Sequence, residues 1–164
     1  MIKVEITKEL LIKAIQYAIN CPIKYHENRD ISPMIKRLIV GKLGELICTA
    51  HFGFLKKIES YDFDFISNIT DKTFEVKTKA ISCEPKPDYK VNLYCVNDYQ
   101  KCDYYLFCMI NTSFETGYIL GFMEKNEFIE RSEFYNAGEK DIETEKVYTH
   151  DAYAMKIKNL FQVD

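Results

Sequence analysis

The chain has 164 residues, of which 47% are hydrophobic and 29% are charged, and its formal net charge is −3. This length suits one domain with its own core, so we expect a single domain over residues 1–164. No apolar run reaches the roughly 20 residues of a membrane helix, which argues against a membrane-spanning protein. The residues after Met1 lack the apolar segment of a secretory signal, so we expect a cytoplasmic location.

The negative charge is concentrated in an acidic tail. Residues 124–146 hold eight acidic and four basic residues, whereas residues 1–123 carry a net charge of +1. The overall charge therefore does not exclude a nucleic-acid partner for the first part of the chain. Lys, Ile, Asn and Tyr are enriched, which is typical of an AT-rich genome such as that of a phage or its host.

Two helices are predicted at the start of the chain. Thr7 can cap a helix that runs to about Asn20, because the apolar residues between them recur at helical spacing. Ser32 suits the N-cap of a second helix, since proline follows at the first helical position. We expect this second helix to run to about His51.

After the second helix the sequence alternates as strands do. Alternation over residues 61–66, turn-like residues 67–72 and alternation over residues 73–79 predict a β-hairpin. The apolar run 103–110 predicts a central strand buried on both faces, and residues 150–160 favour a helix. The remaining predictions are strands at 54–58, 91–96 and 118–123, a short helix at 124–131 and a polar loop at 132–149. The fold class is therefore α/β or α+β, with a central mixed β-sheet flanked by helices.

The sequence Glu75-Val76-Lys77 is the strongest chemical signal. Residues two apart on a strand share a face, so Glu75 and Lys77 project together, with Lys79 beyond them. An acid and a lysine on a rigid strand can bind a metal ion and orient a water molecule for phosphodiester hydrolysis. The same acid-x-Lys pattern occurs twice within residues 84–90, where prolines argue against a regular strand. A solvated strand face is the alternative interpretation.

The hairpin partner adds two acids. Asp62 and Asp64 are expected on one face of the preceding strand, because Phe63 and Phe65 take the other. Cross-strand neighbours lie about 5 Å apart at Cβ, close enough for carboxylates to share a metal ion. For one of the two aspartates, an ion pair with a lysine of the facing strand is the alternative.

A third acid lies in the second helix. Gly41 and Gly44 each cost about 1 kcal/mol in a helix relative to alanine, so we expect this helix to pack closely on the sheet. Glu45 lies away from the apolar stripe and could reach the acids of the hairpin. The alternative is a solvent-exposed glutamate on the helix surface.

The order of these features resembles that of the PD-(D/E)XK nuclease superfamily, which includes restriction enzymes, Holliday-junction resolvases and phage exonucleases. The matching features are G-x-x-G-E in a helix, an aspartate at the start of a strand, a turn, and E-V-K-T-K in the next strand. They lie within residues 32–79, and the motif core is expected over residues 32–110. The resemblance implies a restriction-endonuclease-like core. The proline that names the family is absent before both aspartates, which leaves the choice between them open.

The resemblance implies a role for each matching residue. Asp62 or Asp64 and Glu75 would bind Mg²⁺, for which Mn²⁺ can substitute. The backbone carbonyl of Val76 would assist them. Lys77 would orient or activate the attacking water and stabilise the charge that develops on the phosphate.

Four further residues complete the expected site. Glu45 would be the helix carboxylate that acts on the metal ion or its waters. Lys79, Lys42 and Gln100 are weaker candidates for contacts with nucleic acid.

The expected function is a Mg²⁺-dependent deoxyribonuclease, taken first as an endonuclease. RNA as the substrate and exonuclease action both stay open. The resemblance implies a homodimer or a partner protein as a source of specificity. The alternative is a non-catalytic nucleic-acid-binding or protein-interaction module on the same fold.

Overall fold

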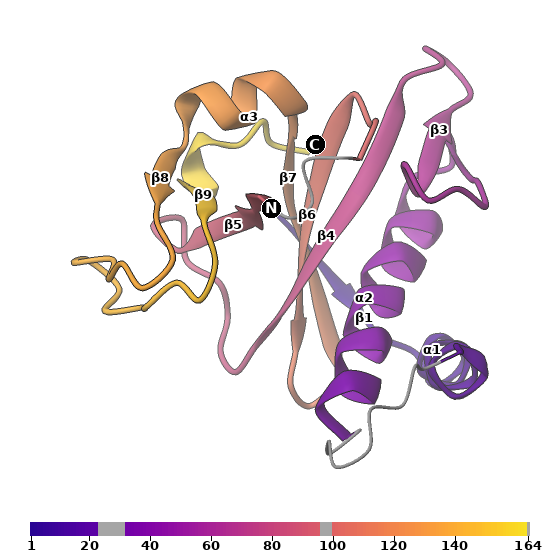
Figure 1. The fold of residues 1–164 in the computed structure, drawn as a ribbon. Helices are drawn as coiled ribbons and strands as arrows, with labels where there is room; N and C mark the ends of the chain where they lie inside the picture. Colours follow the sequence, from indigo (N-terminus) through magenta and orange to yellow (C-terminus); the bar gives the residue numbers. More distant parts are fainter. Residues whose placement is uncertain (23–31, 96–99, 164) are drawn as a thin grey trace.

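The computed structural model describes residues 1–22, 32–95 and 100–163. Figure 1 shows a twisted sheet with helices on one side and a smaller layer on the other. The elements in chain order are β1 (Ile2–Glu5), α1 (Lys8–Asn20), α2 (Ser32–His51), β2 (Leu55–Lys57), β3 (Phe65–Ser67), β4 (Thr73–Ile81), β5 (Lys90–Tyr94), β6 (Tyr104–Asn111), β7 (Thr116–Glu124), α3 (Lys125–Arg131), β8 (Glu133–Tyr135), β9 (Ala152–Lys156) and a 3₁₀ turn (Ile157–Asn159).

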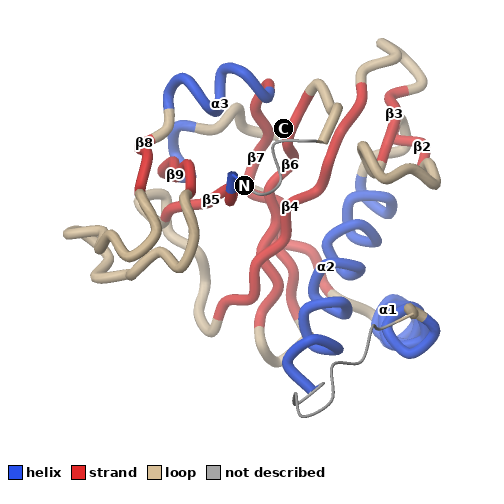
Figure 2. The backbone as a smooth tube through the Cα atoms, in the orientation of Figure 1, coloured by secondary structure: helices blue, strands red, loops and turns tan. Residues whose placement is uncertain are grey.

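The large sheet is mixed, as predicted. Its six strands have the order β1-β7-β6-β4-β3-β2, and β5-β9-β8 form a separate small sheet (Figure 2). Strands β4 and β6 are parallel, whereas the other neighbours in the large sheet are antiparallel. The predicted hairpin is present, since β3 pairs with β4 across residues 68–72. The class is therefore α+β with a mixed sheet.

Helices α1 and α2 cover one face of the large sheet (Figure 1). Leu43 and Ile47 of α2 pack in one core with Val76, Leu106 and Ile119 of the sheet. The expected close approach of α2 to the sheet occurs at Gly44. A Cβ atom there would lie 1.9 Å from Oγ1 of Thr78 on β4, so only glycine fits without a shift.

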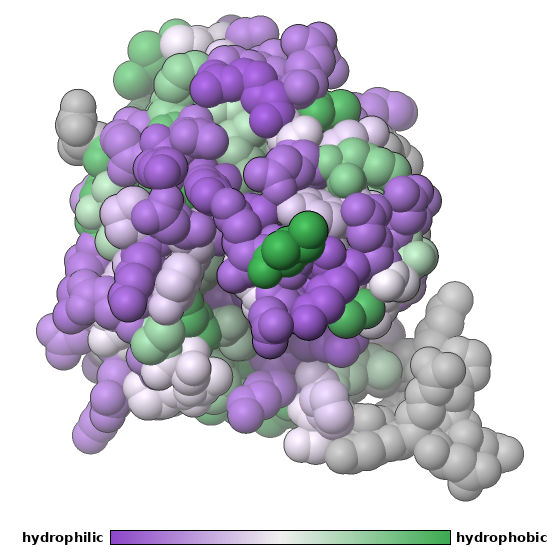
Figure 3. Space-filling view, turned by 90° about the vertical axis from the view of Figure 1, so that its left-hand side faces the viewer, coloured by the Kyte–Doolittle hydropathy of each residue, from purple (hydrophilic) through white to green (hydrophobic). Residues whose placement is uncertain are grey.

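The small sheet and α3 cover the opposite face, where the sequence led us to expect helices alone. Val91 and Met155 of the small sheet and Phe128 of α3 pack in a second core with Phe107 and Met109 of β6. Because β6 contributes to both cores, the prediction of a central strand buried on both faces is confirmed. Figure 3 shows that the outer surface of this second layer is largely hydrophilic.

Two predicted elements differ from the structure, and one strand was not predicted. The stretch 150–160 forms β9 and a 3₁₀ turn instead of a helix, because Ala152 and Ala154 are buried in the small sheet between β5 and β8. Strand β8 lies inside the predicted loop 132–149. Strand β1 was not predicted, and it pairs with β7 at the edge of the large sheet. The last residue of the predicted strand 91–96 lies outside the described residues.

The first strand of the hairpin is shorter than predicted. The chain bends over residues 61–64, and β3 begins only at Phe65. Phe65 packs in the core under α2, whereas Phe63 packs in the second core. The two phenylalanines therefore do not share a face, and the alternation that predicted one face for both aspartates does not continue through the bend.

Candidate functional site

The site forms where β3 stops pairing with β4. Strand β3 pairs with β4 only at Thr73 and Phe74, whereas β4 runs on to Ile81 beside β6. Beyond this point the free edge of β4 is approached by the carboxylate of Asp64. Its Oδ2 accepts a hydrogen bond from the Val76 N–H at 2.9 Å, and the Asp64 N–H donates to the Phe74 carbonyl at 2.9 Å. The backbone of β4 thus fixes this carboxylate in place.

Lys57 of β2 links this carboxylate to helix α2. The Lys57 ammonium lies 2.8 Å from Oδ1 of Asp64 and 2.9 Å from Oε2 of Glu45. Burial alone would lower the pKa of Lys57, but the hydrogen bonds and charges of Asp64 and Glu45 raise it above the usual value. Two carboxylates therefore converge on one positive charge.

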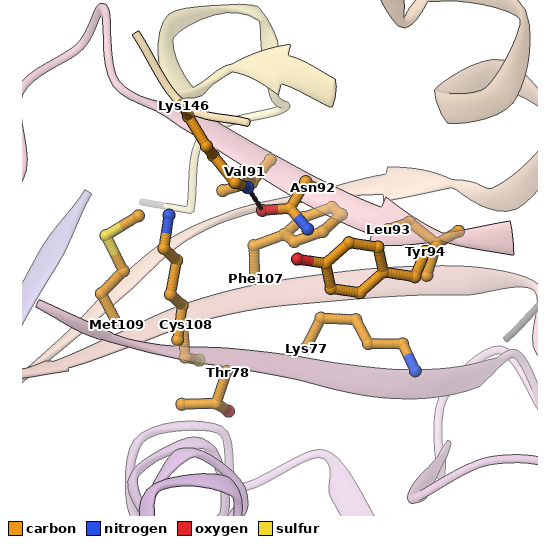
Figure 4. A pocket seen from close by; sticks show the side chains of 11 residues that line it. Lys77, Thr78, Val91, Asn92, Leu93, Tyr94, Phe107, Cys108, Met109 and Lys146 are labelled. Carbon is orange, nitrogen blue, oxygen red and sulfur yellow. Dashed lines mark hydrogen bonds between the residues drawn. The ribbon is translucent and has the colours of Figure 1, made fainter. Parts of the chain in front are cut away.

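Glu75 and Lys77 lie on the opposite face of β4 from α2. Figure 4 shows the Lys77 side chain on the side of β5, whereas Thr78 points toward the helix. The Lys77 ammonium lies 3.1 Å from Oε1 of Glu75, and Gln100 bonds to both groups at 2.5 Å. Burial and the nearby charge of Asp64 raise the pKa of Glu75, while Lys77 and Gln100 oppose that rise.

The structure therefore joins most of the predicted residues in one network. It consists of two sets of contacts, one joining Glu45, Lys57 and Asp64 on the side of α2 and one joining Glu75, Lys77 and Gln100 on the far face. The backbone of β4, whose Val76 N–H donates to Asp64, connects the two sets. The predicted members of this network are Glu45, Asp64, Glu75, Lys77 and Gln100. Val76 takes part through its N–H, whereas the predicted metal contact was through its carbonyl.

Asp62 is not part of this network. Its side chain is 39% exposed, against 18% for Asp64, and it lies 3.8 Å from the ammonium of exposed Lys101. Of the two aspartates, only Asp64 reaches the edge of β4, where its charge raises the pKa of Glu75, because the chain bends before β3.

The two remaining candidates have different surroundings. Lys42 is paired with Oε2 of Glu45 at 2.9 Å and lies over the ring of Tyr17, 4.7 Å from its centre. It therefore neutralises Glu45 in this structure. Lys79 lies farther along β4, on the same face as Lys77, where it lines a cavity between the two sheets.

The carboxylate oxygens of this network are the type of ligand atom that Mg²⁺ prefers. The Lys57 ammonium occupies the position between Glu45 and Asp64. Within residues 1–22, 32–95 and 100–163, however, no three acidic, histidine or cysteine side chains are grouped closely enough to hold a metal ion. The pair of Glu45 and Asp64 would thus hold the ion once Lys57 withdraws, with Glu75 beside Asp64.

Two residues of this network were not predicted. Lys57 is brought to the site because β2 pairs with β3 in antiparallel fashion. The predicted strand at 54–58, just before the predicted hairpin, was the available signal for it. Lys125 donates to the carbonyl of Gln100 at 2.6 Å, and no sequence pattern indicated this contact.

Comparison with known proteins gives no family assignment, since no family model matches the chain and no curated protein is significantly similar to it. In the part of the chain that the structure describes, no helix is both long and apolar enough to cross a membrane.

Proposed function

We propose that this protein is a metal-dependent nuclease that hydrolyses phosphodiester bonds, with DNA as its substrate. The observation that supports this most is the position of Asp64, held on the Val76 N–H between Glu45 on one side and the Glu75–Lys77 pair on the other. Carboxylates and a lysine at one strand edge are the groups that this chemistry uses.

The proposal includes a restriction-endonuclease-like core. It is supported by the order of α2, the antiparallel strands β2, β3 and β4, and then β6 parallel to β4. The sequence features that carry the resemblance lie on α2, directly before β3 and on β4, in the expected order.

In this proposal each side chain has a distinct task. Glu45 and Asp64 hold Mg²⁺, and Glu75 lies beside them. When bound, the ion stabilises the negative charge that develops on a phosphoryl oxygen. Lys77, which Glu75 and Gln100 hold in place, donates a hydrogen bond that orients the attacking water.

One observation favours the alternative of a non-catalytic nucleic-acid-binding or protein-interaction module. Lys42 and Lys57 already neutralise Glu45, and Lys57 also neutralises Asp64. A module of this kind would bind its partner without a metal ion, and the Lys77→Ala variant would bind as well as the wild type.

The test is cleavage by the purified protein. Supercoiled plasmid, linear duplex, single-stranded DNA and RNA are each incubated with Mg²⁺, Mn²⁺ or EDTA. We expect cleavage with either metal ion, none with EDTA, and a rate at least about 100-fold lower in Lys77→Ala, as for the loss of a group that positions a proton transfer.

The matched control is Lys86→Ala. Lys86 also follows an acid by two positions, but it is exposed and lies outside any strand. Equal rates for the wild type and both variants, or no cleavage of any substrate, would contradict the proposed function. Preferential cleavage of RNA would change the assigned substrate from DNA to RNA.

A further inference from the structure

Lys79 lies where three cavities meet, between the two sheets and beside α2. The cavities have volumes of about 300, 310 and 710 Å³, and Lys79 lines all of them. Figure 4 shows the first, with β4 and β6 on one side and β5 on the other. Together they extend from Lys77, at the candidate site, to the start of α2.

The charged residues that line these cavities are all basic. No aspartate or glutamate of the described chain lines any of the three. The basic residues that line them with Lys79 are Lys77, Lys146, Lys90, Lys36, Arg37 and His150. Two of these lysines are paired with acids: Lys77 lies 3.1 Å from Glu75, and Lys90 lies within 3.0 Å of Asp141 and 2.7 Å of Glu133.

Lys79 and Lys146 form the centre of this basic lining. Lys146 is half-buried, donates to Oδ1 of Asn92 at 2.8 Å and lies 4.1 Å from the centre of the Tyr148 ring (Figure 4 shows the bond to Asn92). Neither lysine forms an ion pair with any described residue. Loss of water around Lys146 and the charge of Lys79 lower the pKa of Lys146 to about 8, although Asp141 opposes this.

Two neighbouring cations without a carboxylate are unfavourable by themselves, and an anion between them relieves both the repulsion and the lost hydration. Lysine is a common ligand for phosphate groups. We propose that Lys79 and Lys146 bind a backbone phosphate of a nucleic-acid strand that runs along β4 from Lys77 into the cleft beside α2. This inference rests on the proposed function for the identity of the strand.

The test is binding of short labelled single-stranded and duplex oligonucleotides, measured by fluorescence anisotropy in EDTA so that no cleavage occurs. We expect Lys79→Ala and Lys146→Ala each to weaken binding by about ten-fold. Each should also reduce the slope of log affinity against log salt concentration by about one, because one fewer counterion is released per complex. Lys86→Ala serves as the control and binds as the wild type does. Lys79→Arg and Lys146→Arg retain the charge and should retain binding, which separates this role from a structural one.

Inorganic phosphate and a 5′-mononucleotide, titrated by calorimetry, distinguish the source of the phosphate group. If both alanine variants lose these small ligands but bind oligonucleotides normally, the strand assignment is overturned. Normal oligonucleotide binding by both variants, alongside metal-dependent cleavage lost in Lys77→Ala, would refute this inference and leave the nuclease intact. Weakened binding by both variants in a protein that cleaves nothing would support the phosphate site and refute the nuclease.

Discussion

At the scale of single residues, Lys57 competes with a divalent ion for the carboxylates of the candidate metal site. Its ammonium lies within 2.9 Å of both Glu45 and Asp64, so it balances their charges in the absence of a metal ion. A divalent ion that binds these carboxylates must displace the lysine. Lys57 is 36% exposed, so it has solvent to move into.

Lys57→Ala should therefore bind Mn²⁺ more tightly than the wild type. We expect the dissociation constant to fall by about five-fold, the equivalent of about 1 kcal/mol for two partly exposed ion pairs. Without metal the variant should be slightly less stable, since Glu45 and Asp64 then repel each other. Calorimetric titration with Mn²⁺ and thermal unfolding in EDTA measure the two effects. An unchanged or weaker affinity for Mn²⁺ would show that the lysine does not compete with the ion.

The sequence predicted Glu45, Asp64, Glu75 and Lys77 as candidates, and the structure places them in one network. The sequence could not distinguish Asp62 from Asp64, because residues two apart in an alternating stretch are expected on the same face of a strand. The choice depends on the bend at residues 61–64, which the regular alternation of polar and apolar residues in that stretch does not indicate.

At the scale of elements, the contact between α2 and β4 sets the position of Glu45. Gly44 lies directly before Glu45 and packs against Thr78, where a Cβ would lie 2.9 Å from the Thr78 Cβ. This contact holds the helix close enough to the sheet for Glu45 to share Lys57 with Asp64. A Cβ atom at Gly41, three residues earlier, would meet no atom of the described residues within 4 Å beyond its own helix.

Gly44→Ala should destabilise the protein, whereas Gly41→Ala should not. We expect Gly44→Ala to cost about 1–3 kcal/mol through overpacking. Gly41→Ala should stabilise by up to about 1 kcal/mol, because alanine is the better helix former. Urea unfolding of both variants compares the two positions within the same helix. Equal effects would contradict close packing at Gly44.

Besides β1, the strands that the sequence failed to predict are β8 and β9 of the small sheet. Its strands β8 and β9 are short and come from residues whose composition favours a loop or a helix. Burial in tertiary contacts overrides such local preferences. Long periodic stretches such as α2 and β4 carry enough local signal, which is why their positions were predicted.

At the scale of the whole molecule, the acidic segment 124–146 is part of the folded second layer. It forms α3, β8 and a loop whose acids surround Lys90 of β5. Lys90 and Asp141 are 5% and 2% exposed and lie 3.0 Å apart. Burial alone would raise the pKa of Asp141, but hydrogen bonds from Lys90 and Thr144 hold it below the usual value. This ion pair ties the segment to the small sheet.

Asp141→Asn should reduce stability at neutral pH. We expect the free energy of unfolding to fall by about 2–3 kcal/mol. This is less than the usual cost of breaking a buried ion pair, because Glu133 and Glu143 remain near Lys90. Because the pKa of Asp141 is lowered in the folded state, its contribution is present above the ordinary aspartate pKa of 3.8 and is lost as the pH falls through the folded pKa. The difference between wild type and variant should therefore shrink in acid. Urea midpoints at several pH values between about 3 and 7 measure it, and a difference independent of pH would contradict the assignment.

The central claim is a metal site built on Asp64, and titration of the protein with Mn²⁺ tests it most directly. Wild type, Asp64→Asn and Asp62→Asn form a matched set, since the two aspartates lie two residues apart and only Asp64 contacts the edge of β4. The account predicts that the wild type and Asp62→Asn bind Mn²⁺ equally. Asp64→Asn should bind it at least about ten-fold more weakly, since even changes outside the ligands cost that much. No Mn²⁺ binding by the wild type, or an equal loss in both variants, would contradict it.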